Sequence, residues 1–241
     1  MEIKVLFISG ILSKNISDCE HYITVIITSL MKKQVVLVVL QYFADWEAAY
    51  LSNALNNGPK GQSSLFDVKY ATISDDKVKS SGGMTIIPDY KLGDIPEDIS
   101  ALAIIGGINV LSEEAKMLKP LVSRCIESKI PVGGICNGSI FLGACGFLNN
   151  VRHTSNDLGF LQSVAGDAYT GSSLYLNEQA VCDGGIVTAN GSATLEFTRE
   201  MMILLGAGSR EDADAFYQFH KVGAVDLMKT EEGRAVINKI I

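Results

Sequence analysis

Residues 130–146 place a strand, a sharp turn and a helix in immediate succession. Residues 130–135 form a short apolar run typical of a buried strand, and apolar residues recur at helical spacing from Ile140 onward. Between them stands Gly134-Ile135-Cys136-Asn137-Gly138, a Gly-x-Cys-x-Gly sequence. A turn this tight holds its central residue in a strained conformation and requires neighbours without bulky side chains. The pattern predicts a nucleophile elbow with a cysteine at its tip.

An elbow of this kind presents the sulfur of Cys136 at the carboxyl edge of a sheet and at the amino end of a helix. Unpaired N–H groups and the helix dipole favour a thiolate in that position. The alternative is a buried cysteine in a glycine-rich turn with no chemical role. We favour the functional interpretation, because strand, turn and helix each fall where an elbow requires them.

From residue 35 onward, apolar strands alternate with helices along the chain. Strands are expected at residues 35–40, 66–73, 84–87, 102–105, 130–135 and 185–189. Helices are expected at residues 45–56, with Asp45 as the N-cap, and at residues 112–128, 192–205, 212–222 and from about 225. This alternation predicts an α/β fold with a mostly parallel sheet that is covered by helices on both faces. Ligands of such sheets bind at the carboxyl ends of the strands, near the point where the strand order reverses.

Residues 1–30 lack this alternating pattern. We expect them to form an N-terminal extension of doubtful structure outside the core fold, with one domain at residues 31–241. The five cysteines are widely spread and include no Cys-x-x-Cys pair. This usage fits a reducing cytoplasm and argues against a disulfide framework and a structural zinc site.

The composition narrows the range of partners. A formal charge of −7 without a basic cluster argues against nucleic acid. No apolar run approaches the roughly 20 residues that a membrane span requires. The sequence implies no cofactor and no metal, and a small molecule is the expected substrate.

A nucleophilic cysteine requires a proton acceptor and hydrogen-bond donors for an oxyanion. His153 follows Cys136 by 17 residues, just beyond the elbow helix, and is the candidate base; the alternative is a surface-loop histidine. Gly106 and Gly107 end a buried strand, where glycine lets backbone amides approach a substrate closely. With the amide of Asn137 they are the candidate oxyanion donors, unless they only close a turn.

Glu47 stands after the first strand, at the start of the following helix. As a first-turn acid it would be favoured by the helix dipole alone. Alternatively, it points across the strand ends to Cys136. A buried carboxyl group with a raised pKa would stay protonated there and donate a hydrogen bond to sulfur. The sequence leaves both interpretations open.

Taken in order, these residues resemble the ThiJ/PfpI family within the class I glutamine amidotransferase-like superfamily. The likeness runs from about Lys33 to Gly223. It is carried by Phe43-Ala44-Asp45-Trp46-Glu47, Ile105-Gly106-Gly107, Gly134-Ile135-Cys136-Asn137-Gly138, Arg152-His153-Thr154-Ser155-Asn156 and Thr188-Ala189-Asn190-Gly191. The resemblance implies a flavodoxin-like three-layer αβα sandwich and a homodimer. It also implies an elbow cysteine at Cys136, an acidic neighbour at Glu47 and a site histidine at His153.

Members of this family are similar to peptidases, amidases, glyoxalase-like enzymes and stress-response proteins. The peptidase branch has histidine directly after the elbow cysteine, and Asn137 in that place weakens the peptidase interpretation. His220 is not followed by the x-Glu of a glutaminase, and only Asp157 suggests itself as a third triad member. We expect a cysteine-dependent hydrolase or amidase acting on a small carbonyl or amide substrate. The alternatives are a redox-sensing stress protein in which Cys136 is oxidised to sulfinate, and a glyoxalase-like lyase.

A chain that starts at Met31 is expected to keep the melting temperature and any activity of the full chain, because residues 1–30 show no pattern of a packed element. Thermal unfolding of the two chains side by side checks this. A loss of several degrees would show instead that the first 30 residues pack on the domain.

Overall fold

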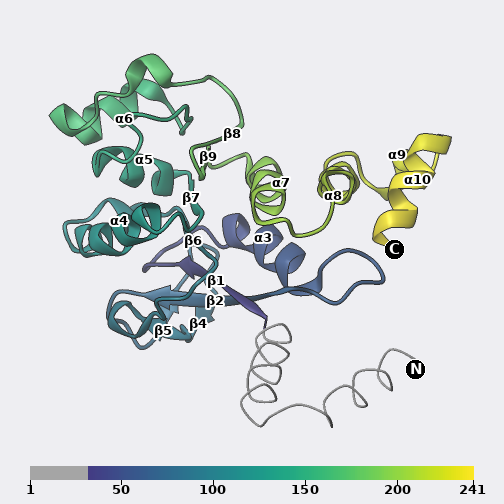
Figure 1. The fold of residues 1–241 in the computed structure, drawn as a ribbon, viewed down its shortest axis with the longest axis horizontal. Coiled ribbons are helices and arrows are strands. Elements are labelled where there is room, and N and C mark those ends of the chain that lie inside the picture. The colour runs from purple at the N-terminus through teal and green to yellow at the C-terminus, as the bar shows by residue number, and fades with distance from the viewer. Residues whose placement is uncertain (1–31) are drawn as a thin grey trace, which may run out of the picture. The chain divides into compact units, whose positions relative to one another are not determined.

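A seven-stranded sheet forms the middle layer of the structure, a computed structural model that describes residues 32–241 (Figure 1). The strand order is β5-β2-β1-β6-β7-β9-β8. Neighbouring strands run parallel except β8, which is antiparallel to β9. The seven strands are β1 (Lys33–Val38), β2 (Phe66–Thr72), β5 (Tyr90–Lys91), β6 (Ala101–Ile104), β7 (Val132–Ile135), β8 (Ala180–Asp183) and β9 (Ile186–Ala189). Two further short strands, β3 (Val78–Lys79) and β4 (Thr85–Ile86), form a separate antiparallel pair.

Helices connect these strands and form the outer layers. The α-helices are α3 (Asp45–Asn57), α4 (Lys119–Glu127), α5 (Asn137–Ala144), α6 (Leu158–Ala165), α7 (Thr194–Leu205), α8 (Arg210–Val222), α9 (Ala224–Leu227) and α10 (Glu231–Ile240). Short 3₁₀ helices are η1 (Leu92–Asp94), η2 (Ile108–Leu111), η3 (Glu114–Leu118), η4 (Gly166–Ala168) and η5 (Ser172–Leu174). Residues Lys33–Ile241 form one compact unit, and the predicted extension at residues 1–30 lies outside the described residues.

The central strand β1 shows why both faces of the sheet are covered. Val35 and Leu37 belong to one apolar core, which also contains side chains of α3, α7 and α8. Val36 and Val38 belong to a second core with side chains of α4, α5 and α6. Successive strand residues point to opposite faces, so a strand that is apolar throughout must be buried on both sides. The predicted three-layer sandwich with a mostly parallel sheet is confirmed.

The strand order brings together the loops that follow β1, β6 and β7, at the carboxyl ends of these parallel strands. From β1, the order runs to β2 on one side and through β6 and β7 to β9 on the other. The strand order therefore reverses between the neighbouring strands β1 and β6. In doubly wound sheets, ligands bind at the carboxyl ends of the strands near such a point. The loops after β1, β6 and β7 lead to Glu47, Gly106 and Cys136, respectively.

The predicted elbow is present between β7 and α5. Cys136 has φ 56° and ψ −127°, a strained conformation for a residue with a side chain. A Cβ at Gly134 would lie 2.6 Å from Leu142 Cδ1, and a Cβ at Gly138 would overlap the Ile104 carbonyl oxygen. The two glycines therefore let α5 pack directly against β6 and β7, which holds the cysteine at the turn.

Several elements differ from the prediction. Asp45 does not cap α3, because its carboxylate accepts hydrogen bonds from Ser80 Oγ (2.5 Å) and Gly82 N–H (3.1 Å) instead. The helix expected at residues 112–128 begins as a 3₁₀ segment and becomes α-helical only at Lys119. Strands β3, β5 and β8 and helix α6 were not predicted, and the strand expected at residues 84–87 pairs with β3 outside the seven-stranded sheet. Among the described residues, no helix is long and apolar enough to cross a membrane.

Substituting Gly138 by alanine is expected to destabilise the fold by about 1–3 kcal/mol, the usual cost of inserting an atom into a close-packed contact. The neighbouring atom is backbone and cannot turn aside. The matched control is Gly159→Ala in α6, where a Cβ would meet only Asp157 Oδ1, at 3.2 Å. Alanine there should be neutral or gain up to about 1 kcal/mol from helix propensity. Urea unfolding measures both, and equal stabilities for the two variants would contradict the packing explanation.

Candidate active site

Glu47 lies in the first turn of α3 and is fully buried, with 0% of its surface exposed. Its Oε2 accepts a hydrogen bond of 2.8 Å from the Gly106 N–H, at the end of β6. Oε1 has no hydrogen bond of regular geometry within residues 32–241. Burial raises the pKa of the carboxyl group to about 7, and the contacts with Cys136 and the Gly106 N–H only partly oppose that rise.

Cys136 lies beside this carboxyl group. A Cβ added at Gly106 would lie 2.5 Å from Glu47 Oε2 and 2.6 Å from Cys136 Cβ. A Cβ added at Gly191 would lie 2.8 Å from Cys136 Sγ and 3.2 Å from Glu47 Oε1. Glycine on both sides thus lets the acid and the thiol come together in one buried space.

The sulfur is ionised less readily than the helix terminus alone would suggest. Burial, and then the charge of Glu47, raise the pKa of the Cys136 thiol to about 11; hydrogen bonds from the Asn156 side chain and the Asn137 backbone act in the opposite direction. Charging either group disfavours charging the other, so the acid and the thiol titrate as a coupled pair. The thiolate is therefore favoured when Glu47 is protonated.

The structure does not bring His153 to the sulfur. The ring is fully buried, with Nδ1 2.8 Å from the Val151 carbonyl oxygen and Nε2 2.6 Å from the Tyr169 hydroxyl. A carbonyl can only accept, so Nδ1 carries the proton and Nε2 accepts from Tyr169. Both ring nitrogens are occupied, and burial lowers the histidine pKa. His153 consequently supports the loop rather than taking a proton from Cys136.

Asn156, three residues further on, is the side chain of this segment that reaches the sulfur. Its Nδ2 lies 3.4 Å from Cys136 Sγ and 3.4 Å from Asn137 Oδ1. Its Oδ1 accepts a hydrogen bond of 2.8 Å from the Gly191 N–H. Sequence reasoning missed this role, because nothing in the spacing distinguishes Asn156 from Thr154 or Ser155.

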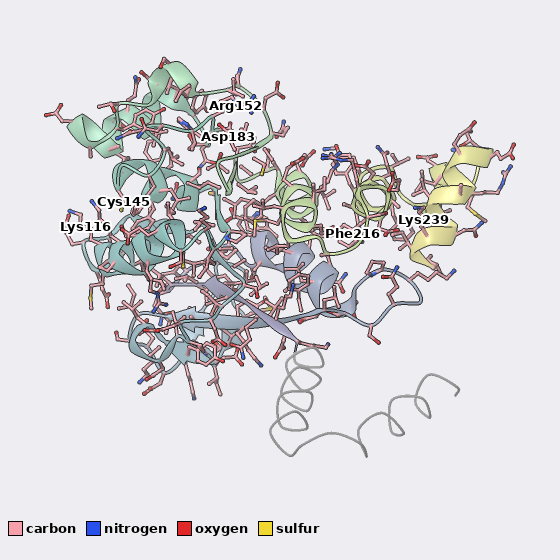
Figure 2. The ribbon with its side chains drawn as sticks, viewed as in Figure 1. Lys116, Cys145, Arg152, Asp183, Phe216 and Lys239 are labelled. Atoms are coloured by element: carbon pink, nitrogen blue, oxygen red, sulfur yellow. The ribbon has the colours of Figure 1, made fainter. Side chains whose placement is uncertain are left out.

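The segment that carries Asn156 is held against the edge of the sheet. The Arg152 N–H donates to Asp183 Oδ2 on β8 at 2.8 Å, and the two side chains lie next to each other (Figure 2). The Thr154 N–H donates to Thr188 Oγ1 on β9 at 2.9 Å. These bonds tie residues 152–156 to β8 and β9, so the position of Asn156 does not depend on a free loop.

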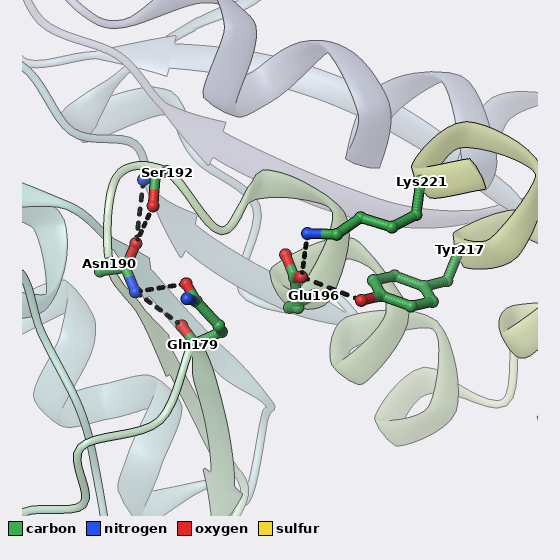
Figure 3. Close-up of polar contacts among 6 residues, drawn as sticks. All are labelled: Gln179, Asn190, Ser192, Glu196, Tyr217 and Lys221. Atoms are coloured by element: carbon green, nitrogen blue, oxygen red, sulfur yellow. Dashed lines mark hydrogen bonds and ion pairs between the residues drawn. The ribbon is translucent and has the colours of Figure 1, made fainter. Parts of the chain in front are cut away.

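Gly191 is presented by a polar turn after β9. Asn190 Oδ1 accepts from the backbone N–H (3.0 Å) and the hydroxyl (2.7 Å) of Ser192, and its Nδ2 donates to Gln179 Oε1 at 2.8 Å (Figure 3). The indole N–H of Trp46 donates to the Gly191 carbonyl oxygen at 3.4 Å. Gly191 in this turn thus contacts Trp46 at the start of α3 and Asn156, and it lies beside the sulfur of Cys136.

The predicted oxyanion donors divide into two groups. The Gly106 N–H is already engaged by Glu47 and is not available to a substrate. Gly107 has φ 139°, and a Cβ there would lie 2.7 Å from the Tyr42 carbonyl oxygen, so only glycine fits. Asn137 begins α5, and its Nδ2 donates to the Gly107 carbonyl oxygen at 3.1 Å. The Gly107 and Asn137 amides remain the candidate oxyanion donors.

Asp157 and His220, the other two residues considered from the sequence, make contacts elsewhere. Asp157 caps α6 by accepting from the Phe160 N–H at 2.7 Å, which gives it a structural role. His220 on α8 packs among Tyr50, Phe216 and Phe219. Within residues 32–241, no group of three or more His, Cys, Asp or Glu side chains is arranged to hold a metal ion.

The raised pKa of Glu47 makes stability depend on pH. The folded state holds the proton more tightly than the unfolded chain, so the stabilisation is complete below pH 4.5 and is lost as the pH rises to about 7. Relative to Glu47→Gln, which has the shape of the protonated acid, the wild type should lose about 3 kcal/mol of unfolding free energy over that range. Chemical denaturation at a series of pH values measures this difference. Parallel curves for the two proteins would show that the carboxyl group is not forced to keep its proton.

Comparison with known proteins shows the family of this chain. Residues 33–204 match the DJ-1/PfpI family. A Bacillus subtilis (strain 168) protein described as the uncharacterized protease YdeA is 33% identical over 194 residues, which cover 80% of this chain and 93% of that protein. A second protein of that strain, the uncharacterized protease YoaZ, is 29% identical over 195 residues, 80% of this chain and 92% of its own.

Crystal structures show the same fold. A DJ-1 superfamily protein from Agrobacterium tumefaciens has a TM-score of 0.70 at 35% identity and covers 79% of this chain and 98% of its own. A ThiJ/PfpI family protein from Bacillus anthracis has a TM-score of 0.76 at 26% identity, with 87% and 98% covered. The resemblance seen in the sequence motifs is confirmed, and the chain belongs to the DJ-1/PfpI family.

Proposed function

We propose that this protein is a cysteine-dependent enzyme that acts on a small carbonyl or amide substrate, with Cys136 as nucleophile and Glu47 as its proton partner. The observation that supports this most directly is the pairing of a strained elbow cysteine with a fully buried carboxyl group whose pKa is about 7. A general base is most effective when its pKa lies near the working pH. Glu47 meets that condition without an imidazole.

In the proposed reaction, Sγ attacks the substrate carbonyl carbon while the thiol proton moves to the Glu47 carboxylate. The oxygen that becomes negative is held by the backbone amides of Gly107 and Asn137. For an amide, collapse of the adduct releases the amine, which takes the proton from Glu47 and leaves a thioester on Cys136. Water then hydrolyses the thioester, Glu47 accepts a proton from that water, and the thiol is restored when the proton returns.

This scheme differs from the expected one in its proton carrier. His153 is not used, because both of its ring nitrogens are already hydrogen-bonded. The names of the two Bacillus subtilis relatives are consistent with a hydrolase but specify no substrate. A homodimer in a reducing cytoplasm remains part of the proposal, as the family resemblance and the cysteine usage suggested.

A second candidate is a redox role in which peroxide oxidises Cys136 to sulfinate. Glu47 Oε1 supports it, since this atom is buried without a regular hydrogen-bond partner within residues 32–241. A protonated carboxyl group there would donate to a sulfinate oxygen. Each of the two oxidation steps would consume one peroxide and release one water.

A screen of small amides, esters, aldehydes and 1,2-dicarbonyl compounds tests the enzyme proposal. Turnover by the wild type should fall by about a thousandfold or more in Cys136→Ser, because the nucleophile is lost. The control Cys182→Ser changes a half-buried cysteine on β8 and should retain the activity. Turnover of dicarbonyls alone would indicate a glyoxalase-like lyase, and turnover that persists in Cys136→Ser would contradict a role for this cysteine. Peroxide-dependent sulfinate without any turnover would favour the redox role.

A further inference from the structure

We infer that Asn156 is a catalytic residue, whose side-chain amide takes the place of an imidazole by donating a hydrogen bond to Cys136 Sγ and selecting the ionised sulfur. This inference deepens the proposed function and takes its mechanistic meaning from it. Its test, however, needs no substrate.

The orientation of the Asn156 amide is set by its neighbours. The Gly191 N–H can only donate, so the atom 2.8 Å from it is the acceptor Oδ1. Nδ2 must therefore face the other way, 3.4 Å from Cys136 Sγ. An amide nitrogen has no acceptor capacity, and it can interact favourably with sulfur only as a donor. Such a donor stabilises a thiolate more than a thiol.

A second amide supports the same orientation from the opposite side. Asn137 Nδ2 donates to the Gly107 carbonyl oxygen at 3.1 Å, which turns Asn137 Oδ1 toward Asn156 Nδ2 at 3.4 Å. The two side chains and the Gly191 N–H thus form one chain of donors and acceptors, with a fixed direction from end to end. Asn156 Nδ2 also faces the Cys136 sulfur, whose charge changes during the proposed reaction.

Asn156 and Glu47 differ in their exposure to solvent. Glu47 is fully buried, whereas Asn156 is exposed to solvent. Among the described residues, Glu47 is the charged group that acts on the pKa of Cys136. Burial lowers the pKa of His153, and its ring nitrogens are bonded to Val151 and Tyr169. The acid receives the proton, and the amide stabilises the charge that remains on sulfur. The division of roles explains how a half-buried cysteine can react without a histidine.

The test is the pH dependence of Cys136 alkylation by iodoacetamide, followed on the peptide that contains Cys136. All variants are made in the full chain with Glu47→Gln, so that the thiol titrates without a charged neighbour. Asn156→Ala removes the donor and should raise the midpoint by about half a unit to one unit. Asn156→Asp keeps an acceptor for the Gly191 N–H but replaces the donor with a negative charge, and it should raise the midpoint further.

Asn149→Ala is the matched control. Asn149 also bridges a loop, with Oδ1 accepting from the Thr170 N–H (2.8 Å) and Nδ2 donating to the Ala168 carbonyl (3.0 Å), but it does not bond to Cys136. Its midpoint should equal that of the parent. The inference is overturned if Asn156→Ala keeps the parent midpoint, or if Asn149→Ala shifts it equally. It is also overturned if Asn156→Asp stays near the parent value, because the residue would then act only by holding Gly191.

The outcome is independent of the proposed function. A shift in the alkylation midpoint supports the donor role even if no carbonyl substrate is ever turned over. Conversely, loss of turnover in Cys136→Ser supports the enzyme proposal even if the Asn156 variants titrate like the parent.

Discussion

The site depends on one unfavourable placement, a fully buried carboxyl group beside a half-buried thiol. Within residues 32–241, the Glu47 carboxyl group has one hydrogen bond of regular geometry, from the Gly106 N–H, and the residue has no exposed surface. A carboxylate in such a place is costly, so the group keeps its proton to a higher pH and the thiol beside it becomes harder to ionise. The chemistry that we propose follows from this coupled ionisation, because either group ionises more easily when the other is protonated.

The fold maintains this placement by packing. Gly106 and Gly191 leave room for the acid and the sulfur, and a Cβ at either position would meet both. Gly134 and Gly138 let the elbow helix approach the strands closely enough to hold Cys136 in its strained conformation. A stable sandwich with two apolar cores supplies the rigidity that such a strained turn requires.

Much of this architecture could be predicted from the sequence, because apolar runs show where the strands end. The apolar runs located β1, β6 and β7, and parallel strands bring their carboxyl ends to one edge. Glu47, Gly106 and Cys136 could thus be predicted as neighbours. The Gly106 amide was expected to face a substrate, but the buried acid takes it, and only the three-dimensional contact shows this.

The choice of His153 over Asn156 shows where sequence reasoning ends. A histidine shortly after an elbow is the natural base, and no sequence pattern reveals that its ring turns inward to Tyr169 and the Val151 carbonyl. Likewise, an acid at a helix start suggests a cap, yet Asp45 binds the turn at Ser80 and Gly82. Both differences arise from contacts between segments that are distant in the chain. Local spacing cannot encode such contacts.

The most direct test of the central claim is a ¹³C NMR titration of the glutamate side-chain carboxyl groups in the full-length protein, with the Glu47 resonance assigned by its absence in Glu47→Gln. We expect this resonance to titrate with a midpoint near 7. A Glu47 carboxyl group that titrates at the ordinary value of about 4.3 would contradict the claim that it shares its proton with Cys136 at neutral pH.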